Sequence, residues 1–514
     1  MIRLQSYLAG CWQDGSGPGT KLTDPVTAEV VATASGDGLD MAQALEHARA
    51  KGGPALRALT FAQRGALINA VAAVLTENRD RYNAIALANS GNTVGDAMLD
   101  VDGGIGTLKY YASLGRKLGE VHTLTEAGGD QLSKDENFRS LHLWTTNPGV
   151  AVHINAFNFP SWGLWEKAAV SLLAGVPFLA KPATATAWLA YEMVKDVVAK
   201  DILPEGALSL LCGGGRDLMD HVRPGDVVAF TGSADTALTL RSHPNVLASN
   251  IRFAVEADSL NLCALGPDAG ADSPEFAAFV KEVTREITVK AGQKCTAIRR
   301  ILVPRARVDA VVAALAAAFA QVRQGDPRDA ETRMGPLVNA SQLRAALDGL
   351  ARLKTEARVV VGGGAADGCF LPPTLLLCDA PESAQAVHAI EVFGPVATLM
   401  PYDSTEQAIA LARRGGGSLA ASVFSGDAGF TASFIPAIAT AHGRVLVVDA
   451  AIAASHTGHG VVMPQCIHGG PGRAGGGEEL GGLRGLRFYM QRTAIQGNKT
   501  TLEALAARSA VVAL

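Results

Sequence analysis

Cys295 is the residue of this chain whose type and surroundings best suit covalent chemistry. It lies in the segment Val289–Ile298, where a Gly-Gln pair ends a helical pattern shortly before a β-branched strand pattern begins. Lys294 is its neighbour, and a nearby cation favours the reactive thiolate over the thiol. We therefore take Cys295 as a candidate nucleophile. The alternative is a buried structural cysteine, which is the usual role of a free cysteine.

Two further residues could assist such a nucleophile. Glu256 follows the strand pattern Ile251–Val255, and a carboxylate at the mouth of a sheet can act as a general base. Asn158 falls in a predicted strand-to-helix turn, where its amide could stabilise an oxyanion. Each also has an ordinary interpretation, because acids often cap helices and asparagines are common in turns.

A second group of residues suits the binding of a nucleotide. Gly232 and Ser233 stand between an apolar strand and a helix, as in turns that bind phosphate at helix N-terminal amides. They do not form a GxGxxG motif, so a plain turn explains them equally well. Lys181 ends another predicted strand and could contact a sugar or phosphate, although most lysines are solvated surface groups. The acid Glu391 stands two residues before the aromatic Phe393, and a Gly-Pro turn follows.

The elements that would position these residues alternate between strand and helix. Strands are expected at 149–154, 176–180, 207–212, 227–231 and 251–255, and helices at 160–174, 188–199 and 234–242, with one more after Gly213–Gly215. This alternation predicts a doubly wound parallel sheet with helices on both faces. Ligands of such sheets lie at the carboxyl ends of the strands, where Asn158, Lys181, Ser233 and Glu256 fall.

A second alternation follows Ser259 and predicts another α/β domain. Its helices are expected at 275–287, 308–322, near 341–353 and near 405–414, and its strand segments at 300–304, 359–361, 391–396 and 445–448. Elsewhere we expect short strands at 5–37, helices at 39–118, an arm or hairpin at 119–147, a glycine-rich loop at 455–487 and a strand at 487–495. In that loop, His459, His468 and Arg473 are either substrate-funnel residues or structural loop residues.

The composition describes an ordinary globular α/β protein of two or three domains, with 514 residues. A net charge of −4 gives no basic surface for nucleic acid. No apolar run approaches the roughly 18 residues of a membrane span, and the N-terminus has no signal-peptide pattern. Seven scattered cysteines without CxxC spacing predict reduced thiols in the cytoplasm, no disulfide framework and no metal site.

Six short motifs occur together and carry a family resemblance. They are Asn158-Phe-Pro160, Lys181-Pro-Ala183, Phe230-Thr-Gly-Ser233, Glu256, Gly292-Gln-Lys-Cys295 and Glu391-Val-Phe-Gly-Pro395. In this order and near these spacings, the chain resembles the aldehyde dehydrogenase superfamily along essentially its whole length. A further set looks like the aldehyde dehydrogenase part of the ring-opening enzymes of CoA-linked aromatic catabolism: Lys181–Trp188, Thr457–Gly460, His468–Leu480 and Tyr489–Gln496.

This resemblance implies roles for the candidate residues. Cys295 would attack an aldehyde as a thiolate, and the Asn158 side chain and the Cys295 N–H would hold the oxyanion. After hydride transfer, Glu256 would activate the water that releases the acid from the thioester. The cofactor would be bound by Lys181, Thr184, Phe157, Gly232, Ser233, Glu391 and Phe393.

Two departures from the family pattern bear on the cofactor. NAD-preferring relatives carry glutamate at the position of Thr184, and that carboxylate would repel a 2′-phosphate. Its absence favours NADP, with NAD as the weaker possibility. Many relatives have a glycine where this chain has Ala237, which argues against the closest helix packing at the cofactor.

The resemblance also implies a fold and a substrate. The expected α/β fold has a Rossmann-like cofactor domain (1–124 and 149–257), a catalytic domain (258–477) and a bridging β region (125–148 and 478–514) that makes a homodimer. The expected reaction is the NADP-dependent oxidation of 3,4-dehydroadipyl-CoA semialdehyde to its acid in aerobic benzoate catabolism. The alternative substrate is the ring-opened semialdehyde of phenylacetyl-CoA catabolism or another aliphatic aldehyde. Phenylacetate-pathway members carry a C-terminal hydratase domain, which we do not expect in a chain of this length.

Three other functions stay open at this point. A CoA-acylating dehydrogenase would pass the thioester to CoA, but such relatives often lack an acid at Glu256. A binding protein on a retired enzyme scaffold is disfavoured by intact Cys295, Glu256 and Asn158, although fold alone does not establish activity. A thiol hydrolase would need a histidine near Cys295 in space, since none lies between His243 and His388 in sequence.

Overall fold

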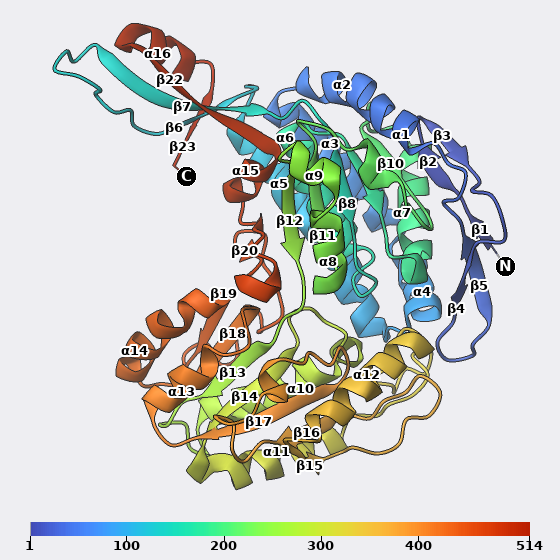
Figure 1. Ribbon diagram of the computed structural model, residues 1–514, viewed down its shortest axis with the longest axis vertical. Coiled ribbons are helices and arrows are strands. Elements are labelled where there is room, and N and C mark those ends of the chain that lie inside the picture. The colour runs from blue at the N-terminus through green and yellow to red at the C-terminus, as the bar shows by residue number, and fades with distance from the viewer. Residues whose placement is uncertain (1, 514) are drawn as a thin grey trace.

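The computed structural model describes residues 2–513, and its body contains two seven-stranded sheets, one above the other in Figure 1. The upper sheet has the order β12-β11-β8-β9-β10-β2-β3, and its strands from β12 to β10 are parallel. The doubly wound sheet predicted from the strand–helix alternation is therefore confirmed. The strand bounds are β2 (Ser6–Leu8), β3 (Cys11–Gln13), β8 (Ala151–Ile154), β9 (Phe178–Lys181), β10 (Leu208–Leu210), β11 (Val227–Thr231) and β12 (Arg252–Glu256).

Helices cover both faces of this sheet because its strands are apolar on both sides. Ala151 and Phe178 belong to the larger core under α3, α5, α6 and α7, whereas Val152 and Leu179 belong to the core under α1. This alternation follows the period of two of a β-strand. The helices of this half are α1 (Met41–His47), α2 (Gly53–Arg57), α3 (Phe61–Glu77), α4 (Arg79–Ser90), α5 (Val94–Leu118), α6 (Trp162–Ala174), α7 (Ala187–Ala199), α8 (Ala234–Arg241) and α9 (Pro244–Ala248), with a π-helical turn at Ala48–Gly52.

The lower sheet has the order β15-β16-β17-β14-β13-β18-β19, and only β15 runs antiparallel to its neighbour. One core packs α10 and α11 on one face, and another packs α12, α13 and α14 on the other. Its strands are β13 (Asn261–Leu265), β14 (Ile298–Pro304), β15 (Arg358–Val361), β16 (Thr374–Leu377), β17 (Val396–Tyr402), β18 (Ser418–Phe424) and β19 (His442–Val448). Its helices are α10 (Pro274–Thr288), α11 (Val308–Ala320), α12 (Ala340–Leu353), α13 (Thr405–Ala412) and α14 (Ala428–Ile438).

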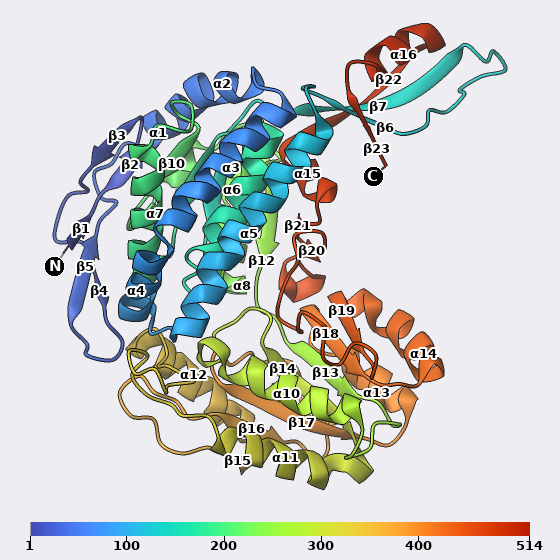
Figure 2. The same cartoon turned by 180° about the vertical axis from the view of Figure 1, so that it is seen from behind.

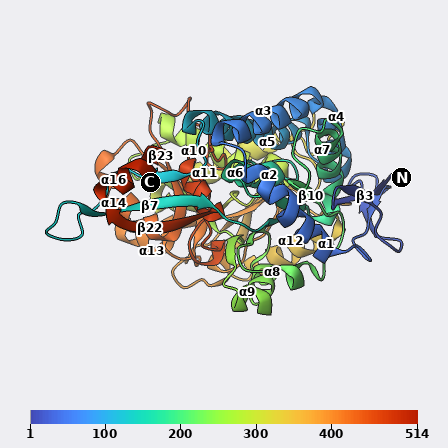
Figure 3. The same ribbon diagram turned by 90° about the horizontal axis from the view of Figure 1, so that it is seen from above.

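A four-stranded sheet of order β22-β7-β6-β23 projects from the body as an arm. It joins segments far apart in the sequence: β6 (Leu124–Glu126), β7 (Phe138–Thr146), β22 (Met490–Asn498) and β23 (Ala510–Val512). Helix α16 (Lys499–Ala506) lies on this arm, and Figure 2 shows the C-terminus beside it. Seen from above, β7 and β22 lie side by side (Figure 3), in register from Phe138 and Asn498 to Thr146 and Met490.

Smaller elements complete the chain. The N-terminal strands β1 (Ile2–Leu4), β4 (Thr20–Thr23) and β5 (Val30–Ala34) form a three-stranded sheet. A two-stranded sheet of β20 (Ile467–His468) and β21 (Glu479–Leu480) precedes helix α15 (Leu483–Tyr489). Short 3₁₀ turns lie at Thr184–Thr186, Leu218–His221, Val289–Gly292, Arg305–Arg307, Ala386–His388, Ala439–Ala441 and Gly472–Ala474.

The structure corrects several expectations about individual elements. Gly213–Gly215 leads only to a 3₁₀ turn, not to a full helix, and the 455–487 region is not a continuous loop because β20, β21 and the start of α15 lie within it. The segment 391–396 is not a strand, since β17 begins only at Val396. The sequence analysis did not predict strands β13, β16, β18 and β23 or helices α9, α14 and α16; most of these segments are short or lie beside glycine-rich turns.

Within residues 2–513, no single helix is both long and apolar enough to cross a membrane. One pair of helices, Met41–Arg57 and Phe61–Glu77, meets the length and composition criteria together, but it is bent by 116°.

Candidate active site

The loop before β14 carries Cys295 on a strained backbone. Lys290 and Ala291 have left-handed φ angles of 53° and 51°, and Gly292 follows at 69°. Such angles are costly for residues with a side chain and persist only where the surroundings impose them. Glycine is required at 292, because a Cβ there would lie 2.2 Å from the carbonyl oxygen of Gly394.

Contacts from three parts of the chain impose this conformation. The Asp96 carboxylate accepts the N–H of Lys290 at 3.0 Å, and Asp96 is itself held in the capping box that begins α5. The Gln293 side chain donates to the Lys290 carbonyl at 3.1 Å and accepts the N–H of Val338 at 3.1 Å. Arg299 donates to the carbonyl of Gly292 at 2.8 Å. The loop is therefore preorganised without a ligand.

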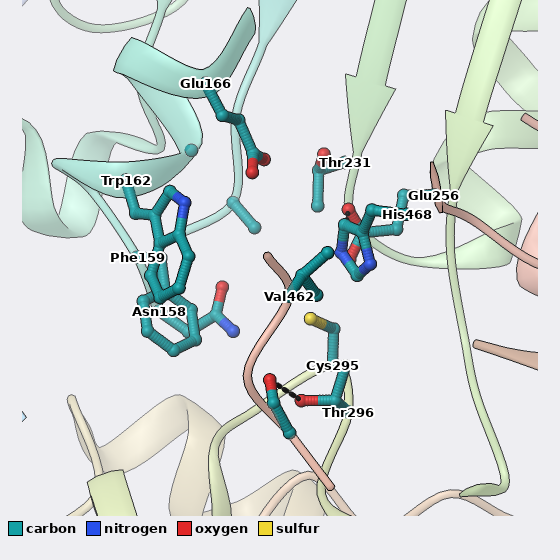
Figure 4. Close-up of a pocket in the computed structure, with 13 residues that line it drawn as sticks. Asn158, Phe159, Trp162, Glu166, Thr231, Glu256, Cys295, Thr296, Val462 and His468 are labelled. Carbon is teal, nitrogen blue, oxygen red and sulfur yellow. Dashed lines mark hydrogen bonds and ion pairs between the residues drawn. The ribbon is translucent and has the colours of Figure 1, made fainter. Parts of the chain in front are cut away.

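Cys295 and Thr296 are held from opposite sides. The Asn261 side chain donates to the Cys295 carbonyl at 2.8 Å and to the Ala297 carbonyl at 2.9 Å. The Thr296 hydroxyl donates to the Gly460 carbonyl at 3.1 Å, the dashed line in Figure 4. These bonds fix the direction of the Cys295 side chain.

The Cys295 side chain lines a cavity of about 50 Å³ between the two sheets, shown in Figure 4. Asn158 lies opposite with its amide turned into the cavity, and Trp162 forms the wall beside it. Gly103 lets α5 pack against that wall, since a Cβ there would lie 2.2 Å from the indole. The lining residues are Ala156, Asn158, Phe159, Trp162, Gly163, Glu166, Thr231, Glu256, Cys295, Thr296, Gly460, Val462 and His468.

A carboxylate and a histidine face the thiol in this cavity. His468 Nε2 lies 3.1 Å from Glu256 Oε2, and both side chains are buried. Burial alone would raise the pKa of Glu256, but the charge of His468 and its hydrogen bond, with Lys167 nearby, hold that pKa well below its usual range. Burial and the Glu256 charge together raise the pKa of Cys295. The resting site therefore pairs a protonated thiol with an ionised carboxylate.

Lys294 acts on Cys295 in the direction that its place in the sequence predicted, but its effect is small. Its ammonium is buried and lies 2.6 Å from Glu286 Oε1, so its charge is largely compensated there. It favours the thiolate of Cys295 only weakly, and burial and Glu256 outweigh it. Adjacency in sequence did not place the cation where the thiol needs one.

A further buried charge cluster adjoins Glu256 and was missed in the sequence. Lys167 Nζ lies 3.1 Å from Glu479 Oε2 and 3.4 Å from Glu166 Oε1. Burial raises the pKa of Glu166 to about 7. Carboxylate oxygens of Glu166, Glu256 and Glu479 lie within 4.8 Å of one another. The signal was present, because Glu166 and Lys167 are adjacent charges in an otherwise apolar, buried helix.

Of the three polar candidates in the glycine-rich region, only His468 lines the cavity. His459 is buried elsewhere and its Nδ1 lies 3.0 Å from the Ser422 hydroxyl. Arg473 pairs with Asp258 at 3.2 Å and donates to the Ala389 carbonyl. The sequence left open whether a histidine lies near Cys295 in space. His468 does, but its charged partner is Glu256.

Candidate cofactor residues from the two halves meet next to the cavity. The rings of Phe157 and Phe393 pack edge to face with centroids 5.7 Å apart. Glu391 Oε2 accepts the N–H of Ser259 at 3.1 Å, while Oε1 lies 3.6 Å from Arg299 Nε and is buried without a hydrogen bond from residues 2–513. Burial raises the pKa of Glu391 to about 7.

The remaining cofactor candidates lie at other strand ends and do not line the cavity. Lys181 ends β9, and Thr184 begins the 3₁₀ turn that follows it. Ser233 caps α8 by accepting the N–H of Thr236 at 3.3 Å, while the Gly232 N–H donates to the Glu256 carbonyl at 3.1 Å. Ala237 is the buried residue of α8, so its methyl group is accommodated in the small core there.

Comparison with known proteins now identifies the family. The sequence profile of the aldehyde dehydrogenase family matches residues 12–495. The chain belongs to the aldehyde dehydrogenase family, and is an oxidoreductase. It is 54% identical over 479 residues, 91% of this chain and 93% of the relative, to the 3,4-dehydroadipyl-CoA semialdehyde dehydrogenase of Aromatoleum evansii. It is also similar to Protein MaoC of Klebsiella aerogenes, with 51% identity over 173 residues. This match covers 33% of this chain and 52% of that protein.

Solved aldehyde dehydrogenases share the fold. A betaine aldehyde dehydrogenase of Staphylococcus aureus, solved with NAD⁺, superposes with a TM-score of 0.81 and 25% identity, covering 96% of each chain. Lactaldehyde dehydrogenase of Escherichia coli superposes with a TM-score of 0.84 and 22% identity, covering 96% of this chain and 99% of the other. The predicted aldehyde dehydrogenase fold is confirmed.

Proposed function

We propose that this enzyme oxidises 3,4-dehydroadipyl-CoA semialdehyde to the corresponding acid, with NADP⁺ as the preferred cofactor. The observation that carries the substrate is the 54% identity, over 91% of this chain, to the enzyme that bears this substrate in its name. The site supports the reaction type, because Cys295, Glu256 and Asn158 line one cavity.

In this proposal, different residues of the chain supply the nucleophile, the base and the oxyanion donors at the carbonyl carbon. Cys295 Sγ attacks the aldehyde, and Glu256, ionised at rest, accepts the thiol proton. The Asn158 amide and the Cys295 N–H stabilise the oxyanion, a contribution of about 3–4 kcal/mol per donor in comparable sites. A bound nicotinamide would supply the hydride acceptor, and loss of the hydride from the carbon attached to Cys295 would leave a thioester there. Glu256 passes the thiol proton to solvent and is again a carboxylate, so it can take a proton from the water that attacks the thioester. The acid leaves, and Glu256 returns this proton to the Cys295 sulfur.

His468 positions the base in this scheme. It holds one carboxylate oxygen of Glu256 at 3.1 Å and leaves the other, Oε1, without a hydrogen bond inside the described part of the chain. That oxygen is available to the thiol proton and later to water. The presence of Glu256 in the cavity also favours hydrolysis of the thioester over its transfer to CoA.

The residues of the cofactor side fit a nicotinamide nucleotide. The buried Glu391 Oε1 could accept a ribose hydroxyl, and the Phe157–Phe393 pair offers an apolar wall for the ring. Thr184 supports NADP because it carries no charge to repel a 2′-phosphate. Arg216 is an exposed cation that could pair with this phosphate. It follows Gly215, where an added Cβ would lie 3.8 Å from the Lys181 side chain.

The arm supports assembly as a homodimer. Its outer strand β22 spans nine residues and, within residues 2–513, pairs only on one side, leaving an open edge. Such edges are usually covered by another chain or element. Val511 and Phe138 on the arm are exposed apolar residues at 61% and 40%. Light scattering should give about twice the mass of one chain, and a single-chain mass would contradict the dimer.

The test is reduction of NADP⁺ with 3,4-dehydroadipyl-CoA semialdehyde, run beside NAD⁺ and beside simple aliphatic aldehydes. We expect turnover that prefers both NADP⁺ and the CoA-linked substrate, and no turnover in Cys295→Ala. Equal rates with simple aldehydes would contradict the substrate. A preference for NAD⁺ would contradict the cofactor alone. Normal turnover by Cys295→Ala would contradict the chemistry.

A further inference from the structure

Three different metal-binding side chains converge at the bottom of the cavity. A sulfur of Cys295, an imidazole nitrogen of His468 and a carboxylate oxygen of Glu256 all lie within 4.8 Å of one another. A tetrahedral zinc ion holds such atoms about 3.4–3.6 Å apart, given bonds of about 2.1 Å to nitrogen and oxygen and about 2.3 Å to sulfur. The Glu256–His468 separation, 3.1 Å, is already close to this, so zinc coordination requires the Cys295 sulfur to approach by no more than about 1.2 Å.

A second observation points to an absent ligand. Glu256 is 3% exposed, yet its Oε1 has no hydrogen-bond partner among residues 2–513. A buried carboxylate oxygen is rarely left unpaired. The oxygen belongs to a side chain that lines the cavity with Cys295 and His468, so a cation in the cavity would satisfy it.

The local charge favours a dication. The thiolate of Cys295, the carboxylate of Glu256 and a neutral His468 together carry two negative charges, which balance Zn²⁺. Glu166 and Glu479 add acidic groups within 4.8 Å of Glu256, against the ammonium of Lys167. The cavity leaves room for a water molecule as a fourth ligand.

We propose that Cys295, Glu256 and His468 form a zinc site that reversibly inhibits the enzyme. On binding, a Zn–S bond replaces the S–H bond of Cys295, and the imidazolium proton of His468 is also released to solvent. Nothing is oxidised or reduced. The ion blocks turnover because it takes the sulfur lone pair that would attack the aldehyde.

The ligand set predicts which metals compete. Thiolate and imidazole suit Zn²⁺ and Co²⁺, whereas Mg²⁺ and Ca²⁺ prefer oxygen ligands alone. Millimolar Mg²⁺ or Ca²⁺ is therefore expected to leave both activity and zinc binding unchanged. Co²⁺ is expected to report the site directly, through a sulfur-to-cobalt charge-transfer absorption.

Binding is measured on the full-length protein without cofactor, so the result does not depend on the identity of the aldehyde. Equilibrium dialysis against buffered Zn²⁺ should give one ion per chain. The same ion should slow alkylation of Cys295 by iodoacetamide at least about 10-fold, read by mass spectrometry of its peptide. A chelator should restore the original rate.

Variants separate this site from adventitious thiols. His468→Phe should weaken zinc binding by at least about 100-fold, since loss of even a supporting partner costs 10–100-fold in metal sites. The matched controls are Cys11→Ser and Cys466→Ser, which remove the two exposed cysteines. Both should retain wild-type zinc affinity and basal turnover.

Each outcome decides the proposal. One zinc per chain, protection of Cys295 and weakened binding in His468→Phe support it. Unchanged affinity in His468→Phe, or loss of zinc sensitivity in Cys466→Ser or Cys11→Ser, overturns it. If His468→Phe does not fold, wild-type protein decides: the absence of both the cobalt–sulfur band and Cys295 protection overturns the site, and their presence supports it.

Discussion

The two sheets present opposite ends of their strands to the active site. The upper sheet uses carboxyl ends: Asn158 follows β8, and Glu256 ends β12. The lower sheet uses amino ends: Cys295 precedes β14, and Glu391 precedes β17. The carboxyl ends of the upper strands therefore face the amino ends of the lower strands across the cavity. Residues from both sheets line the cavity or lie beside it.

This difference has a physical consequence for how the residues are held. In the upper sheet, Glu256 is itself the last residue of β12, and its carbonyl accepts the Gly232 N–H at 3.1 Å, so the sheet fixes its backbone, whereas Asn158 lies in the turn after β8. At the amino ends of the lower sheet, loops must hold the residues. The Cys295 loop needs left-handed residues and at least three buried polar partners to hold its shape. The proposed nucleophile thus lies on the more strained side and its proposed base on the more regular side.

The largest expected effect concerns the lower sheet. Cys295→Ala removes the only covalent group of the proposed mechanism, so kcat should fall at least about 10⁴-fold, as for other catalytic nucleophiles. NADP⁺ binding, measured by fluorescence quenching, should be unchanged. The matched control Cys466→Ser should keep its activity. Residual turnover within about 10-fold of wild type would show that this end of the lower sheet does not carry the chemistry.

The second-largest expected effect concerns Glu256, the proposed base at the end of β12. Glu256→Gln keeps the shape but cannot accept a proton, so kcat should fall by about 10²–10⁴-fold, the usual range for general bases. The variant slows both steps at which Glu256 accepts a proton, but hydrolysis should suffer more, because a thiol can lose its proton to solvent far more readily than water can. The thioester should therefore accumulate. Mass spectrometry of a quenched reaction would detect it on Cys295. A variant that is slow but accumulates no acyl-enzyme would place Glu256 before, and not after, hydride transfer.

Asn158→Ala tests the other carboxyl end of the upper sheet. Loss of one oxyanion donor should lower kcat by about 10²–10³-fold while KM changes little, because the donor acts mainly in the transition state. Asn158→Asp is the sharper companion, since it keeps the size and replaces the donor with a negative charge. Equal activity of both variants and wild type would remove Asn158 from the mechanism.

The smallest expected effect lies farthest from the cavity, at the end of β9. Thr184→Glu places a carboxylate where the 2′-phosphate of NADP is expected, and should raise the KM for NADP⁺ on the order of 10- to 100-fold relative to NAD⁺. Thr184→Gln is the uncharged control of similar size. Steady-state kinetics with both cofactors measure the ratio. An unchanged ratio would mean that the adenosine ribose lies elsewhere.

The sequence predicted the upper sheet better than the lower one. The rule that ligands lie at the carboxyl ends of parallel strands pointed to Asn158, Lys181 and Glu256 from the strand pattern alone. In the lower sheet the same rule would point to the carboxyl ends of the strands, whereas Cys295 and Glu391 lie at the amino ends. Cys295 and Glu391 stood out through their motifs instead, and the strand expected at 391–396 begins only at Val396.

Contacts between distant segments were beyond local patterns. His468 looked like one polar residue in a glycine-rich region, and only the pairing of β20 with β21 brings it near Glu256. Glu166, Lys167 and Glu479 form one cluster although a long stretch of chain separates Glu479 from the other two. Lys294 is the opposite case: it is next to Cys295 in sequence, but its ammonium pairs with Glu286, eight residues earlier in α10, and it favours the thiolate only weakly.

The sequence by itself determined the residue types and the alternation of elements: a cysteine after a Gly-Gln break, acids and amides at strand ends, and strands that bury both faces. These are local properties, since they follow from side-chain chemistry and from strand and helix periods of about 2 and 3.6 residues. The tertiary structure alone decided the protonation of the site. The pKa values of Cys295, Glu256 and Glu166 depend on burial and on charges from other parts of the chain, which only the packed fold brings within a few ångströms.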